Sequence, residues 1–192
     1  MEKTMQKIRY PVLAALAMAV VCVACTRKPT IQQYQKDGIQ FSYPSDWAVT
    51  KDAPVDGNAN VRAINIEGPD NAVIVMICLP ASSNQTLEEY AAAVAKNRDA
   101  AIEGKLSLGP LKGAEVRGTS GPTTGKVAGQ EQQGILQQFT INLLGTQVPH
   151  EAKYFVVQGS RYKTIVMSQV ATASAAATHP ASELILNTLT AE

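Results

Sequence analysis

The stretch Asp37-Gly-Ile-Gln-Phe-Ser-Tyr-Pro-Ser-Asp-Trp47 contains the first clear strand of this chain and the turn that ends it. Apolar and polar residues alternate along it, so Ile39, Phe41 and Tyr43 are expected on one face of an extended strand. The proline that follows ends the strand, because it lacks an amide hydrogen for a further ladder bond, and the next residues predict a turn. We expect Tyr43 and Trp47 to anchor a hydrophobic core here, with a ligand groove as the alternative.

Two further strands are expected on the C-terminal side of this stretch. Residues 61–67 and 72–79 are apolar runs separated by the turn signal Gly68-Pro-Asp-Asn71. The run at 72–79 is apolar on both faces, so we place it in the middle of a sheet and expect cover on both sides. Residues 51–60 are rich in Asp, Pro, Gly and Asn and are predicted to form a loop.

The clearest helix of the chain begins after Thr86. Thr86 and Glu89 have the spacing of a capping box, and apolar residues then recur at helical spacing as far as Ile102. Arg98 falls on the apolar side of this helix, so its methylene stem is expected to lie along that face.

Strands dominate the C-terminal half, and a second helix closes it. Three segments either alternate apolar and polar residues or are continuously apolar, and short turns join them. They are residues 132–144, 148–158 and 162–170. A short strand is expected around 114–117, followed by a flexible loop at 118–129. Pro180 suits the first turn of a final helix that ends near Leu189.

This order of elements predicts an α+β domain in which helices flank a mostly antiparallel sheet. The opening stretch resembles the start of PsbP-like domains, a family that includes DcrB-type bacterial lipoproteins and the PsbP proteins of photosystem II. The matching residues are Gly38, Phe41, Tyr43, Pro44 and Trp47. The resemblance extends over roughly residues 31–189 and implies an α/β/α sandwich with a binding or assembly role. It transfers no metal site, because no ligand motif of the family can be matched.

The N-terminus has the order of residues found in a secretory signal peptide. A basic start with Lys3, Lys7 and Arg9 precedes an apolar run that ends at Ala24, and this run is too short to span a membrane as a helix. Cys25 follows directly, which resembles a bacterial lipoprotein signal, in which the chain is cut before the cysteine and the cysteine carries the lipid. Simple secretion is the alternative.

A lipoprotein signal implies fatty-acyl chains such as palmitate on Cys25 and a location in the cell envelope. With Thr26 next, the resemblance implies the outer membrane facing the periplasm if the source has two membranes. The expected organisation is a signal peptide at 1–24, the lipidated cysteine with a polar tether at 25–36, and a single domain at 37–190.

Charge and cysteine content exclude several classes of protein. The chain has a net charge of +1 and scattered basic residues, which does not suit a nucleic-acid-binding surface. Cys22 leaves with the signal and Cys25 is assigned to the lipid, so Cys78 has no partner for an intramolecular disulfide. Because Cys78 lies in an apolar run, it is predicted to be a buried thiol without reactivity.

No catalytic residue, cofactor or metal site is predicted. His150 and His179 lie on different elements and are too few for a zinc site. The segment Gly121-Pro-Thr-Thr-Gly-Lys126 lacks the first glycine of a phosphate loop and the hydroxyl residue after its lysine.

We therefore expect a non-enzymatic envelope protein that binds or helps to assemble an envelope protein partner. The alternative is a lipoprotein that captures a small ligand or metal ion near Trp47 and residues 51–60. A hydrolase is a third possibility, which needs a nucleophile and a base brought together by the fold.

Overall fold

The computed structural model describes residues 29–105, 107–108, 111–112, 114–143 and 145–192. The signal peptide and Cys25 lie outside these residues. Within the described part of the chain, no helix is long and apolar enough to cross a membrane.

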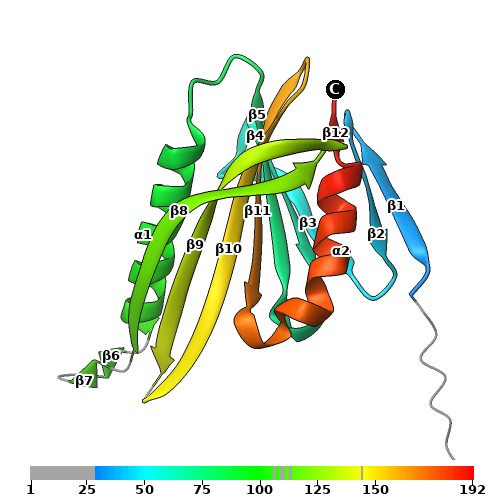
Figure 1. Cartoon of the computed structure of the whole chain (residues 1–192). Coiled ribbons are helices and arrows are strands. Elements are labelled where there is room, and N and C mark those ends of the chain that lie inside the picture. Colours follow the sequence, from blue (N-terminus) through cyan, green and yellow to red (C-terminus); the bar gives the residue numbers. More distant parts are fainter. Residues whose placement is uncertain (1–28, 106, 109–110, 113, 144) are drawn as a thin grey trace, which may run out of the picture.

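The chain folds into three layers (Figure 1). The central layer is an antiparallel sheet in the order β3-β4-β5-β11-β10-β9-β8. Its strands are β3 (Ala48–Val55), β4 (Asn58–Glu67), β5 (Val73–Pro80), β8 (Ala114–Val127), β9 (Gln130–Leu143), β10 (Thr146–Gln158) and β11 (Tyr162–Ala171). The helix α1 (Leu87–Lys105) covers one face, and α2 (Ala175–Thr188) covers the other. This arrangement confirms the predicted α+β class and the α/β/α sandwich.

A small second sheet lies beside α2. It consists of β1 (Ile31–Lys36), β2 (Ile39–Pro44) and β12 (Thr190–Ala191), with β2 in the middle. The remaining described elements are a short ribbon of β6 (Ser107–Leu108) and β7 (Leu111–Lys112) and two 3₁₀ turns, η1 (Pro69–Asn71) and η2 (Thr172–Ser174).

Each face of the central sheet has its own apolar core. On β5, Ile74, Met76 and Cys78 pack in the core under α2, while Val73 and Val75 pack in the core under α1. This alternation confirms that β5 is an internal strand covered on both sides, as its continuous apolar run predicts. Cys78 is fully buried, as predicted, and burial raises the pKa of its thiol.

Three predicted irregular segments are strands instead, so those predictions are wrong. The predicted tether contains β1, the predicted loop at 51–60 contains the end of β3 and the start of β4, and the predicted loop at 118–129 contains most of β8. Each missed hairpin closes through two residues that both have positive φ: Asp37-Gly38, Asp56-Gly57 and Ala128-Gly129. Positive φ at both central residues is the type I′ geometry that matches strand twist. Glycine and aspartate here therefore mark two-residue turns within a sheet.

The other features of β8 explain why its strand pattern is weak. β8 is an edge strand, where proline and glycine are tolerated because one side of the backbone has no ladder partner. Gly125 lies directly over the Phe155 ring, since an added Cβ would come within 2.6 Å of Phe155 Cζ. The glycine that suggested a flexible loop is required for close packing.

The closing helix begins earlier than predicted. α2 starts at Ala175, so Pro180 lies inside the helix and not in its first turn. Without an amide hydrogen, Pro180 cannot bond the carbonyl one turn back. The helix nevertheless continues, because Ile185 and Leu186 are anchored in the core beneath it.

Candidate functional site

Trp47 is both a core residue and part of the wall of a groove. It is 3% exposed, and its indole ring packs so closely on Gly68 that an added Cβ would come within 2.3 Å of Cε2. Tyr43 packs against the same core. The prediction that Trp47 and Tyr43 are core anchors is therefore confirmed.

The groove beside Trp47 has a volume of about 420 Å³ and lies between the start of the small sheet, η1 and α2. Its walls are mostly apolar and include Ile31, Pro44, Trp47, Pro69, Ala177 and Leu184. Ile31 is 57% exposed and is the only large hydrophobic residue that the described chain leaves exposed. Such a groove offers apolar contact area in a concave shape.

The segment 51–60 does not belong to this groove. Asp52 contacts Lys36, the last residue of β1, whereas the groove contains Ile31, the first residue of β1. A six-residue strand spans about 16 Å between its ends. The predicted site near Trp47 and residues 51–60 is therefore divided into two separate places.

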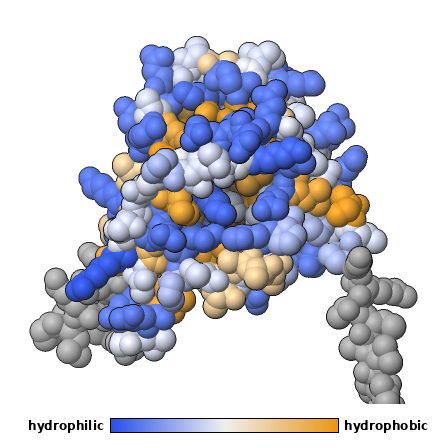
Figure 2. All heavy atoms as spheres, viewed as in Figure 1, coloured by the Kyte–Doolittle hydropathy of each residue, from blue (hydrophilic) through white to orange (hydrophobic). Residues whose placement is uncertain are grey.

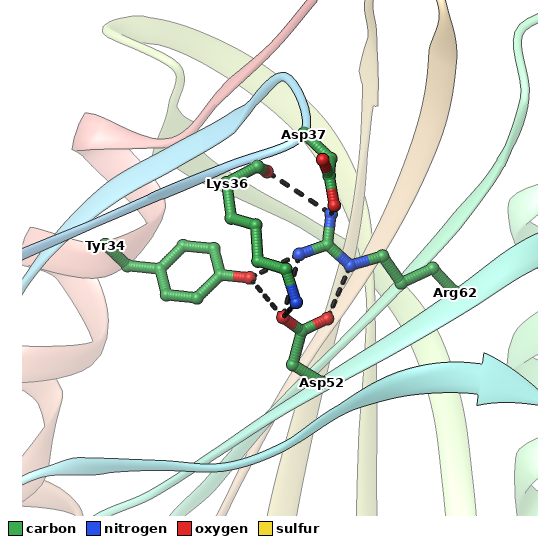
Figure 3. Close-up of polar contacts among 5 residues, drawn as sticks. All are labelled: Tyr34, Lys36, Asp37, Asp52 and Arg62. Atoms are coloured by element: carbon green, nitrogen blue, oxygen red, sulfur yellow. Dashed lines mark hydrogen bonds and ion pairs between the residues drawn. The ribbon is translucent and has the colours of Figure 1, made fainter.

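Residues at that second place form a polar cluster between the two sheets (Figure 3). The Asp52 carboxylate accepts hydrogen bonds from Arg62 Nε at 2.5 Å and Nη2 at 3.0 Å, from Lys36 Nζ at 2.6 Å and from the Tyr34 hydroxyl at 2.9 Å. Arg62 also donates to the Tyr34 hydroxyl and, at 3.2 Å, to the Lys36 carbonyl oxygen. Its Nη1 lies 3.6 Å from Asp37 Oδ2.

The electrostatics of this cluster indicate a structural clamp. Hydrogen bonding from Arg62 holds the pKa of Asp52 well below its usual range, so Asp52 stays ionised and is a poor proton acceptor. Burial and the Asp52 carboxylate raise the pKa of Tyr34. The cluster joins β1 of the small sheet to β3 and β4 of the central sheet. Sequence reasoning missed it because it assigned Tyr34 and Lys36 to a tether.

A second buried polar contact lies on the opposite face, under α1. Gln137 is 6% exposed and accepts a hydrogen bond from the Tyr154 hydroxyl at 2.9 Å, while its amide donates to the Ala91 carbonyl oxygen at 3.0 Å. Burial raises the pKa of Tyr154 to about 12. The Arg98 guanidinium stacks 3.7 Å above the centre of the Phe139 ring. The prediction that Arg98 lies along the apolar face is therefore confirmed.

The two histidines have separate partners. His150 stacks on Phe139 with ring centres 5.3 Å apart, and its Nδ1 lies 2.9 Å from the Val148 carbonyl oxygen. His179 Nε2 lies 2.7 Å from Glu151 Oε1, which joins α2 to β10. Among the residues that the structure describes, no three His, Cys, Asp or Glu side chains are grouped as a metal site.

A second cavity, of about 460 Å³, lies between α2, β8 and β10. Its lining includes Lys126, Lys153, Phe155, Glu183 and Asn187. Lys126 ends the segment that superficially resembles a phosphate loop. That segment lies on β8 and leads through a tight turn into β9, so the rejection of a helix-bound phosphate loop is confirmed.

Comparison with known proteins gives similarity at the level of solved structures. No protein-family model matches the chain, and no curated protein sequence matches it. The solution structure of cyanobacterial PsbP (CyanoP) from Synechocystis sp. PCC 6803 is similar with a TM-score of 0.48 and 14% identity, covering 89% of this chain and 97% of that chain. LpqN of Mycobacterium tuberculosis, described as involved in cell envelope biogenesis, is similar with a TM-score of 0.39 and 15% identity, covering 83% of this chain and 91% of that chain.

These similarities assign neither an activity nor a site residue to this chain. The first structure belongs to the family that the opening stretch resembles. The DcrB-type part of that resemblance stays a prediction.

Proposed function

We propose that this chain is a lipid-anchored, non-enzymatic protein of the bacterial cell envelope that binds an envelope protein partner through the groove beside Trp47. The observation that carries the proposal is the position of this groove, at the end of the domain where the chain arrives from Cys25.

The first described residues are held firmly at the groove. The Thr30 amide donates to Ser45 Oγ at 3.1 Å, and the Ser45 amide donates to the Thr30 carbonyl oxygen at 2.7 Å. Five residue steps separate Cys25 from Thr30, which is a reach of at most about 18 Å. A lipid on Cys25 would therefore hold the groove close to the membrane surface.

The groove favours a partner with a defined chemistry. Its walls are apolar, and the exposed carboxylates of Asp46 and Asp70 lie beside Trp47 and Pro69. An apolar segment flanked by lysine or arginine matches both properties, because apolar anchors supply affinity and rim charges supply orientation. The face seen in Figure 2 is mostly hydrophilic, with hydrophobic residues in small separate patches.

The polar cluster supports a role without catalysis. The Asp52 carboxylate already accepts bonds from three side chains, and the raised pKa of Tyr34 opposes its use as a base. Capture of a small ligand is the second candidate function, and it is favoured by the other cavity, beside α2, β8 and β10.

The anchor is tested by intact mass and membrane fractionation of the wild type and Cys25→Ser. We expect a lipid-sized mass increase and membrane association that both disappear in the variant. An unmodified wild-type protein in the soluble fraction would contradict the anchor.

The groove is tested by in vivo crosslinking of the wild type, Ala177→Glu and Ala176→Glu. Both alanines are exposed on α2, but only Ala177 lines the groove. We expect Ala177→Glu to lose the crosslinked partner and Ala176→Glu to keep it. Equal crosslinking in the two variants would contradict the groove as the docking site while leaving the anchor intact.

A further inference from the structure

The second cavity, between α2, β8 and β10, has the construction of a ligand site. Its volume of about 460 Å³ falls within the range typical of small-molecule pockets. Its walls come from three elements that are distant in sequence, with Lys126 on β8, Lys153 on β10 and Asn187 on α2. Pro180 and Leu184 on α2 provide its accessible apolar surface, because Phe155 and Leu186 are only 1% and 6% exposed.

Two contacts between α2 and the strands fix the walls of this cavity. The Ala128 amide, in the β8–β9 turn, donates to the Leu186 carbonyl oxygen at 2.9 Å. His179 and Glu151 join α2 to β10 at 2.7 Å between Nε2 and Oε1. Both contacts hold α2 at a set distance from the strands, so the cavity is preformed.

The charges around the cavity favour an anion. Lys126 has no ion pair with any residue in the described part of the chain. Lys153 Nζ lies 3.6 Å from Glu151 Oε1, but that carboxylate is shared with His179. Glu183 is the only acidic residue in the lining, and it is exposed. The lining therefore holds two lysines and one glutamate, of which Lys126 and Glu183 are exposed.

We propose that this cavity binds a small organic anion, with its carboxylate or phosphate between Lys126 and Lys153 and its apolar body against Pro180 and Leu184. This cavity adjoins the Trp47 groove and shares Pro180 and Leu184 with it. Lys126 and Lys153 line this cavity and not the groove, so their variants test it independently of the partner proposed for the groove.

The test uses the full, processed chain in lipid nanodiscs and saturation-transfer NMR, with empty nanodiscs as the blank. Phenyl phosphate is the probe, while inorganic phosphate carries only the charge and benzyl alcohol carries only the apolar ring. We expect phenyl phosphate to bind more tightly than either. Lys126→Gln and Lys153→Gln should each bind it about tenfold more weakly, as expected for the loss of one charge-assisted hydrogen bond.

Lys96→Gln is the matched control, because Lys96 is exposed on α1 across the sheet and loses the same charge. Its affinity should equal that of the wild type. No binding of phenyl phosphate, or equal weakening in all three variants, would overturn the proposal.

Discussion

At the scale of single residues, Asp52 supplies the carboxylate on which the polar cluster is built. It is held by Arg62, Lys36 and Tyr34 and is 16% exposed. Asp52→Asn should lower the free energy of unfolding by about 2 kcal/mol, because the negative charge and one of the two oxygens that accept from Arg62 are lost. Urea denaturation measures this, and Glu88→Gln, which removes an exposed carboxylate on α1, is the control. A similar loss in both variants would contradict the clamp.

The same residue gives the fold a defined pH dependence. The pKa of Asp52 is lower in the folded state than its usual value, so its contribution to stability is complete above the unfolded value of about 3.9. That contribution is lost as the pH falls through the folded value. The stability difference between wild type and Asp52→Asn should therefore shrink below about pH 4. A constant difference across this range would show that the charge of Asp52 is not responsible.

Sequence reasoning predicted those residues whose environment follows from their neighbours in the chain. Cys78 lies in a continuous apolar run, and Arg98 lies on the apolar side of a strong helix, so both positions could be predicted. The contact between Tyr34, Asp52 and Arg62 joins two sheets across turns. Periodicity carries no information about which strands of different sheets lie together.

At the scale of elements, the start of α1 depends on a capping box. The Glu89 amide donates to Thr86 Oγ1 at 3.1 Å, and the Thr86 amide donates to Glu89 Oε2 at 3.0 Å. Thr86→Ala should lower the free energy of unfolding by about 1 kcal/mol, measured by urea denaturation. Ser82→Ala, at a nearby exposed position, should have no effect. An equally large loss at Ser82 would contradict the cap.

Elements with strong local signals were predicted, and those without them were not. The capping box and the helical spacing of apolar residues predict α1, and a run that is apolar on both faces predicts β5. β1 has only Tyr34 partly buried, so it shows no alternation, and β8 has glycine where its backbone approaches Phe155. In both cases tertiary contacts supply what the local pattern lacks.

At the scale of the whole molecule, the small sheet joins the first and last described strands. β1 and β12 both pair with β2, and the Glu192 amide donates to the Gly38 carbonyl oxygen at 2.9 Å. Leu189, just before β12, is fully buried. The layer order could be predicted from the sequence, but this pairing between distant segments could not, because β12 is only two residues long.

Removal of residues 189–192 should therefore loosen the N-terminal strands. We expect a loss of about 2–5 kcal/mol in the free energy of unfolding, as for other deletions of large buried side chains, and faster hydrogen exchange in β2. Exchange in α1, on the opposite face, is the internal reference. Unchanged protection of β2 would contradict the link between the chain ends.

The pairing of β12 with β2 also sets an order of events during biogenesis. A chain made or exported from its N-terminus presents β1 and β2 first, yet their sheet is complete only when Thr190 and Ala191 arrive. Contacts between distant segments form late, because the loop between them must close first. The small sheet of an incomplete polypeptide therefore lacks its third strand until Thr190 and Ala191 are added, and β2 keeps one edge open until then.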